Sequence, residues 1–374
     1  MKTQLLGGIT PQQFLAEYWQ KKPLLIRQAI PGFNGVVELD ELFELACDAD
    51  VESRLIRHDD AGWHVTSGPQ EESDLERTDQ PWTVLVQGLN LWLREADELL
   101  HRFNFIPQAR LDDLMVSYAT DGGGIGAHVD SYDVFLLQGQ GKRRWRIGDQ
   151  GEHRLVEGAP LQLIADFQPT EEWVLESGDM LYLPPHFAHE GTAVGECTTY
   201  SIGFRAPKAQ ELGTEFLVWL TERIDLRGIY TDPDLALQEN SAEISHAMVD
   251  RIADMLNTIR WDRADVADFL GEYLSEPKSS VFFIPPESSE TLAEEDFSEA
   301  VAHHGFILDP GTLLLVHDDS FHLNGEVFEV DPDDRGIMRE LAHARGLPAG
   351  AQSPGVLDCL YELYLDGLGY PDYP

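Results

Sequence analysis

Basic residues are scarce in this chain. Of its 374 residues, 26 are Lys or Arg and 67 are Asp or Glu, which gives a net charge of −41. A field of that sign repels phosphate, so it excludes a general affinity for DNA or for anionic lipid. It permits a basic protein partner. The acidic composition also suits a cytosol of high salt concentration, where screening reduces the repulsion between the acidic residues. A basic partner and adaptation to salt both remain possible interpretations of the charge.

Cysteines and long apolar runs are also scarce. Cys47, Cys197 and Cys359 are far apart and odd in number, so they form neither a disulfide framework nor a paired metal knuckle. No apolar run approaches the ~18 residues that span a bilayer, and the apolar stretch in residues 1–13 is too short for a signal peptide. We therefore expect a cytoplasmic protein that does not associate with membranes.

The pattern along the chain changes twice, as its length allows for two or three domains. Residues 1–206 contain short β-type runs separated by Gly and Pro. This pattern predicts a β-sandwich or small barrel that is preceded in the sequence by a helix. Residues 207–275 have apolar residues at i, i+3 and i+4 and are predicted to be helical. Residues 276–374 combine a helix, a hairpin turning at Asn324-Gly325 and a further helix, as in a winged helix.

The last two segments also predict how the chain associates. Residues 276–374 contain 4 basic and 20 acidic residues, so we expect no binding of nucleic acid by the winged-helix-like domain. The helical segment has more apolar surface than one short bundle can hide, which predicts a homodimer through this segment. The residues on which this rests are Phe216, Leu217, Trp219, Leu220 and Ile224.

A candidate metal site is the most informative feature. His128 and Asp130 are two residues apart in GGGIGAHVDSYDVF, a spacing that puts both side chains on one face of a strand. His189 follows a strand that ends at Pro184-Pro185, in GDMLYLPPHFAHEG. Two imidazoles and one carboxylate form the facial triad of non-haem Fe(II) oxygenases. The alternative is that these histidines are surface or packing residues. The glycines within 122–126 predict a mobile lip or a turn with positive φ.

Four motifs occur in a fixed order: WQKKPLLIR, GxGxHxD, QGQGKRRWRIG and GDMLYLPPHFAHEG. In this combination the chain resembles the JmjC-type cupin 2-oxoglutarate oxygenases, and among them the bacterial ribosomal oxygenases that hydroxylate an arginine of large-subunit ribosomal protein 16. The resemblance implies a mainly β catalytic domain over residues 1–206, a double-stranded β-helix of the cupin/JmjC jelly-roll type. An α-helical dimerisation domain over 207–275 and an acidic α+β winged-helix-like domain over 276–374 would follow.

The resemblance also implies roles for individual residues. His128, Asp130 and His189 would hold Fe(II), with 2-oxoglutarate and O2 as co-substrates. The distal carboxylate of 2-oxoglutarate needs a buried cation, and strand alternation puts Arg143 on the face of Trp145 and Ile147. Ser117 is a candidate for a second contact, or else a strand serine bonded to backbone. The other cations of the run, Lys142, Arg144 and Arg146, would face solvent.

A target arginine needs a carboxylate in its plane and an aromatic face beside it. Asp113 and Tyr132 offer both, and Ser201 would complete the grip; alternatively, Asp113 only caps a loop. We therefore expect an Fe(II)/2-oxoglutarate protein hydroxylase acting on the β-carbon of an arginine in a basic ribosomal protein. Two alternatives remain open: a same-fold oxygenase acting on histidine, another protein or a small molecule, and a non-oxidative metal-binding cupin.

Overall fold

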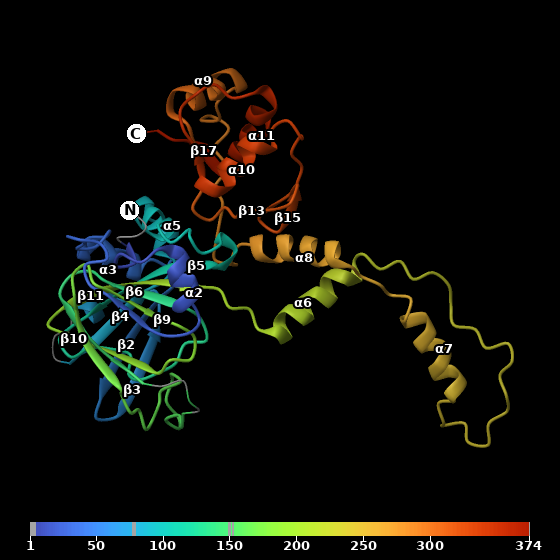
Figure 1. The fold of residues 1–374 in the computed structure, drawn as a ribbon, viewed down its shortest axis with the longest axis horizontal. Coiled ribbons are helices and arrows are strands. Elements are labelled where there is room, and N and C mark those ends of the chain that lie inside the picture. The colour runs from blue at the N-terminus through green and yellow to red at the C-terminus, as the bar shows by residue number, and fades with distance from the viewer. Residues whose placement is uncertain (1–4, 77–79, 149–150, 152, 374) are drawn as a thin grey trace. The chain divides into compact units, whose positions relative to one another are not determined.

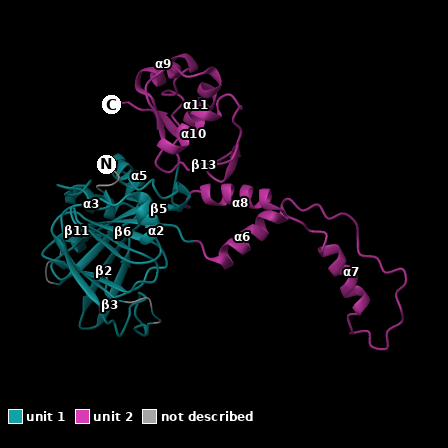
Figure 2. Ribbon diagram, in the orientation of Figure 1, with its two compact units in different colours: residues 1–206, 279–282 teal, residues 207–278, 283–374 magenta. Residues whose placement is uncertain are grey.

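The computed structural model describes residues 5–76, 80–148, 151 and 153–373 (Figure 1). The start of the N-terminal segment that we compared with a signal peptide, residues 1–4, lies outside them. The chain forms two compact units, residues 1–206 with 279–282 and residues 207–278 with 283–374 (Figure 2). By contacts, the helical segment is grouped with the C-terminal part, and the three-domain division stays a prediction. Among the described residues, no helix is long and apolar enough to cross a membrane.

The N-terminal unit is built on two antiparallel sheets. The larger has the strand order β1-β9-β6-β11-β5-β4-β2-β3, and the smaller has the order β10-β7-β8. The strands are β1 (Leu24–Ile26), β2 (Ser53–Asp59), β3 (Gly62–Ser67), β4 (Trp82–Val86), β5 (Leu111–Ala119), β6 (Val134–Gln138), β7 (Lys142–Ile147), β8 (Glu171–Glu176), β9 (Met180–Leu183), β10 (His189–Val194) and β11 (Cys197–Phe204). This double-sheet architecture confirms the predicted cupin-type fold.

One apolar cluster fills the space between the two sheets. Val134, Leu136, Leu181 and Leu183 of the larger sheet pack in it with Trp145, Ile147 and Leu175 of the smaller sheet. A separate cluster on the outer face of the larger sheet includes Leu114, Val116 and Tyr118 of β5. Successive side chains of a strand point to opposite faces. The odd-numbered residues of β5, which include Asp113 and Ser117, therefore face the interior between the sheets.

Helices cover the outer face: α2 (Pro11–Glu17), α3 (Leu39–Cys47), α4 (Glu72–Leu75) and α5 (Arg94–His101), with the short 3-10 helices η1 (Leu89–Leu91) and η2 (Gln108–Arg110). The opening helix α2 starts at a capping box, in which the Thr10 hydroxyl and the Gln13 side chain each accept the other residue's backbone N–H. Its Phe14 is fully buried and contacts Tyr182 edge-on, with ring centroids 4.9 Å apart. The sequence predicted a helix here that stops at Pro23, and the observed helix ends earlier, at Glu17.

Asp133 joins the opening segment to the start of β6. Its side chain is fully buried and accepts hydrogen bonds from the Tyr182 hydroxyl at 2.6 Å and from Gln20 Nε2 at 2.9 Å. Arg110 Nη2 lies 3.6 Å from the same carboxylate. Burial raises the pKa of Asp133, against the lowering effect of these partners. The carboxylate therefore fixes the N-terminal segment to the chain three residues beyond Asp130.

The C-terminal unit contains α6 (Ala209–Thr221), α7 (His246–Leu256), α8 (Arg263–Ser275), α9 (Glu294–His304), α10 (Arg335–Ala344) and α11 (Pro354–Leu365). Its strands form two small sheets, β16 (Gly346–Leu347), β12 (Phe306–Leu308) and β17 (Gly369–Pro371) in one, and β13 (Leu314–His317), β14 (Ser320–Leu323) and β15 (Glu326–Phe328) in the other. A cluster that includes Phe297, Val301, Met338, Leu341 and Leu360 forms the core around α9, α10 and α11.

The predicted hairpin is a three-stranded meander in the structure. The turn at Asn324-Gly325 joins β14 to β15 as expected, with Asn324 at φ 49°. A further turn joins β13 to β14, and its Asp318 has φ 47°. Aspartate tolerates this left-handed conformation but signals it weakly. The sequence therefore disclosed the turn that contains glycine and not the one that lacks it.

Candidate metal and co-substrate site

His128 lies on an irregular segment. It forms an isolated antiparallel bridge with His189, in which each residue's backbone N–H donates to the other's carbonyl at 3.0 and 2.9 Å. Gly126, two residues earlier, has φ 90°, so the backbone leaves the extended path there. The prediction of a continuous strand through His128 and Asp130 is wrong, and the glycine turn is the physical reason. A bridge to His189 brings the two imidazoles together instead.

The side chains of His128, Asp130 and His189 meet at one point. Each offers a ligand atom, and the three atoms lie within 4.8 Å of one another. Asp130 Oδ2 is 3.5 Å from His189 Nε2, and Asp130 Oδ1 is 4.0 Å from His128 Nε2. The two imidazole centroids are 4.3 Å apart. This donor set, two nitrogens and one carboxylate, fits a divalent iron ion with positions left open.

Backbone carbonyls orient both imidazoles. His128 Nδ1 lies 2.9 Å from the Gly126 carbonyl, and His189 Nδ1 lies 2.9 Å from the Phe187 carbonyl. Because a carbonyl only accepts, each Nδ1 carries the proton and each Nε2 keeps its lone pair for a metal. Burial, and then the neighbouring His128, lower the pKa of His189 to about 4, although Asp130 opposes this. His189 is therefore neutral near pH 7, the form that binds metal.

Arg143 points into the interior between the sheets. Along β7, the side chains of Arg143, Trp145 and Ile147 are buried, whereas Lys142 and Arg144 are exposed, so the predicted alternation of faces is confirmed. Lys142 pairs with Glu176 at 2.6 Å, and Arg146 Nε donates to Glu190 at 2.7 Å. Arg143 is 3% exposed, and its Nε and Nη2 have no hydrogen-bond partner in the described part of the chain. Burying a cation whose donors lack acceptors costs free energy, so we expect these two nitrogens to bind an anionic ligand.

Thr83 is a residue that the sequence analysis missed. Its hydroxyl is fully buried and, among the residues described, has no hydrogen-bond partner; the same is true of the Trp145 indole N–H. In the larger sheet, Thr83 of β4 is the strand partner of Ala119 of β5. In the smaller sheet, Ala193 of β10 is the strand partner of Arg143 of β7. Ala119 and Ala193 pack against each other and so connect the two pairs. Thr83 and Arg143 therefore face the interior from opposite sheets at the same end. A lone hydroxyl in the apolar strand WTVLV was the available signal.

Ser117 also faces the interior, at 3% exposure. Its hydroxyl donates to the Thr199 carbonyl at 3.4 Å, so the alternative, a strand serine bonded to backbone, is observed. The length of this bond makes it weak. A contact between Ser117 and a co-substrate stays a prediction.

The three predicted substrate residues lie on neighbouring elements. Asp113 accepts a hydrogen bond from the Gly88 N–H at 3.1 Å, so its carboxylate does cap a loop. The pKa of the half-exposed Tyr132 is raised, first by partial burial and then by the nearby carboxylates of Asp130, Asp113 and Asp112. Ser201 is 8% exposed on the interior face of β11. Carboxylates around a phenol ring are a suitable environment for a guanidinium.

Comparisons with known proteins give a consistent result. The JmjC domain family matches residues 98–212, and the ROXA-like winged helix family matches residues 258–370. Over 345 residues the chain is 33% identical to the ribosomal protein uL16 3-hydroxylase of Escherichia coli K12, covering 90% of this chain and 89% of that protein. Over 236 residues it is 42% identical to a probable ribosomal oxygenase of Haemophilus influenzae, covering 62% of this chain and 56% of that one.

Solved structures agree with these relatives. The X-ray structure of E. coli YcfD matches with a TM-score of 0.85 at 31% identity, covering 97% of this chain and 98% of that one. The E. coli ribosomal oxygenase YcfD in complex with cobalt and 2-oxoglutarate matches over the same shares with a TM-score of 0.82, and with cobalt and succinic acid with 0.80.

Proposed function

This chain belongs to the JmjC-type ribosomal oxygenases, and from that premise we propose that it hydroxylates the β-carbon of an arginine in ribosomal protein uL16. It is a 2-oxoglutarate-dependent oxygenase that uses Fe(II), with O2 as the other co-substrate. The observation that carries the proposal is the buried guanidinium of Arg143, whose Nε and Nη2 have no hydrogen-bond partner among the described residues, in the same domain as the His128, Asp130 and His189 cluster.

The chain's own residues bind and orient the reactants. His128, Asp130 and His189 would hold the metal through two Nε2 atoms and a carboxylate, on one face of the ion. Bound iron and 2-oxoglutarate supply the oxidising chemistry. Arg143 would anchor the distal carboxylate of 2-oxoglutarate with its fork of donors. Thr83 is a second donor from the opposite sheet. Apolar neighbours of Arg143 exclude water and so strengthen this pair.

The target arginine would lie between Asp113 and Tyr132, with Ser201 as a further hydrogen-bonding group. Asp113 is fixed by the Gly88 N–H, so one of its oxygens is positioned before the substrate arrives. The charges of Asp130, Asp113 and Asp112 raise the pKa of Tyr132, and this negative potential favours a cationic side chain over a neutral one. A positioned substrate needs little reorganisation before its hydrogen is removed. The net charge of −41 would steer a basic ribosomal protein toward the enzyme.

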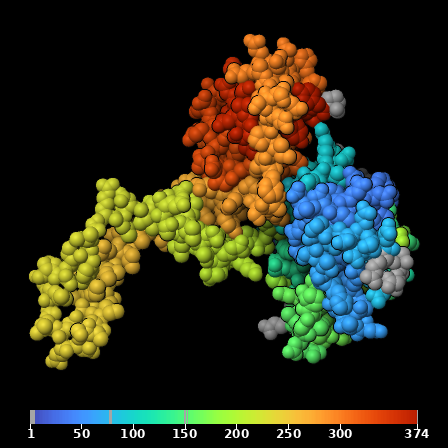
Figure 3. Space-filling view, turned by 180° about the vertical axis from the view of Figure 1, so that it is seen from behind, coloured from blue at the N-terminus to red at the C-terminus, as the bar shows by residue number. Residues whose placement is uncertain are grey.

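We infer a cytoplasmic homodimer through residues 207–275. In this segment α6 packs on α8, where Phe216 and Trp219 contact Phe269, and Trp219 Nε1 donates to Glu272 at 2.9 Å. None of the residues of α7, all of them described, is buried. Its exposed apolar residues are Met248, Val249, Ile252, Met255 and Leu256. The segment that carries α7, drawn in yellow in Figure 3, is uncovered on the face in view.

A second copy of the chain is the partner that would cover this apolar surface. Light scattering at micromolar concentration, in both low and high salt, is expected to give the mass of a dimer. A monomeric mass in both buffers would refute the inference.

The experiment that tests the function compares uL16 in cells with and without this protein. We expect an arginine of uL16 to be heavier by one oxygen atom only when the protein is present. Purified enzyme with Fe(II) and 2-oxoglutarate should add the same oxygen to an arginine peptide of uL16. An added oxygen on a histidine would support the alternative same-fold oxygenase. No added oxygen, with no optical change when 2-oxoglutarate meets the anaerobic Fe(II) protein, would support a non-oxidative cupin.

A further inference from the structure

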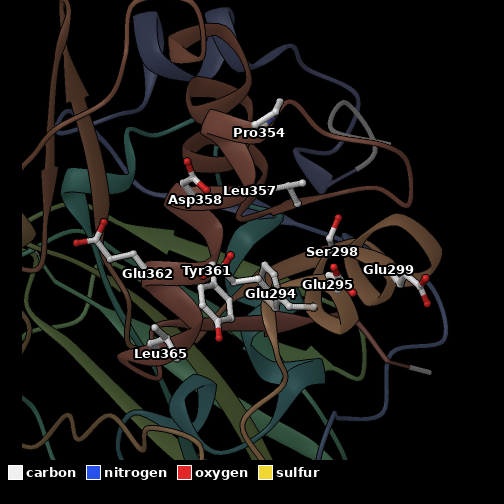
Figure 4. Close-up of a pocket in the computed structure, with 11 residues that line it drawn as sticks. Glu294, Glu295, Ser298, Glu299, Pro354, Leu357, Asp358, Tyr361, Glu362 and Leu365 are labelled. Carbon is white, nitrogen blue, oxygen red and sulfur yellow. The ribbon is translucent and has the colours of Figure 1, made fainter.

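A groove of about 640 Å3 lies between α9 and α11 in the C-terminal unit (Figure 4). Its base includes Phe297, which belongs to the core of the unit and is 1% exposed. The groove is lined by residues of both helices and by none of the residues in the predicted metal site. It therefore needs an explanation other than the hydroxylase chemistry.

The α11 wall of the groove is apolar along one stripe. Leu357, Tyr361 and Leu365 follow one another at i, i+4 and i+8, so they lie on one face of the helix. The Tyr361 hydroxyl donates to the Leu292 carbonyl at 2.9 Å, which holds the ring in place. Leu365 remains 41% exposed at one end of the stripe. Leu357 and Tyr361 are half-buried against the core of the unit, and the exposed edge of the stripe is apolar surface that another helix could cover.

Exposed carboxylates border this stripe. They are Glu294, Glu295 and Glu299 on α9 and Asp358 and Glu362 on α11. None of the five forms an ion pair with any basic residue for which the structure gives a position. The apolar stripe is thus bordered by negative charges that no basic residue of the described chain neutralises by an ion pair.

Helix stability explains only part of this charge. Glu294 and Glu295 lie in the first turn of α9, where the helix dipole favours acids. Glu362 is near the C-terminal end of α11, where the dipole disfavours them. Asp358 and Glu362 also form a like-charged i,i+4 pair, as do Glu295 and Glu299, and such pairs destabilise a helix. The stability of their own helices therefore does not account for Glu299, Asp358 and Glu362.

We propose that this groove binds a lysine- and arginine-rich amphipathic helix of a protein partner. Such a helix presents apolar side chains to Leu357, Tyr361 and Leu365 and cations to the acids on both sides. The aliphatic stems of Lys and Arg would cover further apolar surface while their charged ends reach the rim. Nucleic acid is repelled by these acids, and a small polyamine would leave the apolar stripe uncovered. The proposal goes beyond the hydroxylase function and does not depend on it.

The test uses the full-length protein without metal or co-substrate. The probe is a fluorescein-labelled peptide with leucines at i, i+4 and i+8 and lysines on its other faces, and binding is followed by fluorescence anisotropy. In the triple variant Glu299→Gln, Asp358→Asn, Glu362→Gln, we expect the Kd to rise on the order of tenfold. Because the substitutions remove like-charge repulsion, the variant should melt no lower than the parent.

Two matched controls separate a groove from a general charge effect. The first is the triple variant Glu326→Gln, Glu329→Gln, Glu340→Gln, which removes the same charge from exposed sites of the same unit outside the groove. The Kd should change by less than about twofold there. The second is a peptide of the same composition whose leucines do not share a face, and it should bind more weakly than the probe.

Four outcomes would overturn the proposal. Equal weakening in both triple variants would mean that the peptide senses only net charge. Equal binding of the rearranged peptide would remove the role of the apolar stripe. Displacement of the probe by micromolar spermidine would identify a site for small cations. A fall in mass by light scattering on Leu365→Ser would show that a second copy of the chain occupies the groove.

Discussion

The two units of this protein leave opposite charges without partners, and they do so in opposite environments. In the N-terminal unit the guanidinium of Arg143 is 3% exposed and has donors without acceptors in the described chain. In the C-terminal unit the acids around the α9–α11 groove are exposed to water. Burying an unpaired charge lowers the free energy of unfolding by roughly several kcal/mol, whereas leaving a charge exposed to water lowers it little. The same kind of observation therefore predicts a large effect of mutation in one unit and a modest effect in the other.

The largest effect should follow from removing a metal ligand. We expect His128→Ala and Asp130→Ala each to abolish turnover, because a facial triad with one ligand missing holds the ion poorly. Neither side chain belongs to the apolar core, so its removal leaves no core cavity and the melting temperature should change little. His64→Ala is the matched control, since it removes an exposed imidazole 3.1 Å from Asp59 in the same unit. Near-native turnover of either triad variant at low added iron would contradict the ligand assignment.

The next effect tests the unpaired cation directly. Truncating one partner of a partly dry guanidinium–carboxylate pair costs about 2–5 kcal/mol. Arg143→Ala should therefore raise the apparent 2-oxoglutarate constant by roughly 30-fold to several thousand-fold. Arg143→Lys should recover part of this loss, because lysine keeps the charge but not the fork.

The control for that series is the neighbouring Arg144, which is exposed on the other face of β7. Arg144→Ala should leave the apparent constant almost unchanged when iron is saturating. If Arg144→Ala were the more damaging change, the assignment of the faces of β7 would be wrong.

A third prediction concerns the stability of the C-terminal unit alone. A methyl group at Gly271 of α8 would collide with the ring of His322, which is 1% exposed. Gly271→Ala should lower the free energy of unfolding of this unit by about 1–3 kcal/mol while turnover stays unchanged.

Gly213 of α6 provides a matched control of opposite sign. It has no atom within 4 Å of the added methyl group, so Gly213→Ala should stabilise the unit by about 0.5–1 kcal/mol. Thermal melting of both variants checks the pair. A stabilising Gly271→Ala would show that His322 does not pack as described.

The smallest effect compares two interior hydroxyls. Thr83 has no hydrogen-bond partner in the described structure, whereas Ser117 donates to Thr199. A neutral hydrogen bond is worth about 0.5–1.5 kcal/mol. Thr83→Val should raise the apparent 2-oxoglutarate constant by roughly 2-fold to 10-fold, and Ser117→Ala should raise it less. A larger effect at Ser117 would reverse the order and remove Thr83 from the site.

Much of this could be predicted from the sequence because alternation and turn chemistry are local. The run KRRWRI determined which side of β7 Arg143 faces, and Asn324-Gly325 determined one turn of the meander. The bridge at His128 could not be predicted in this way, because it depends on a partner sixty-one residues later and on a glycine turn between extended residues. Thr83 was missed because only the fold places β4 and β7, the strand that carries Arg143, on opposite sides of the same interior.

Asp133 has a consequence for anyone who shortens this protein. Its carboxylate receives Gln20 from the opening segment, and it lies three residues after Asp130. A chain that starts beyond Gln20 would leave this fully buried carboxylate with fewer hydrogen-bond donors. We expect this loss to destabilise the adjacent loop, which carries His128 and Asp130. A shortened catalytic fragment should therefore still include Gln20, which follows the end of α2 at Glu17.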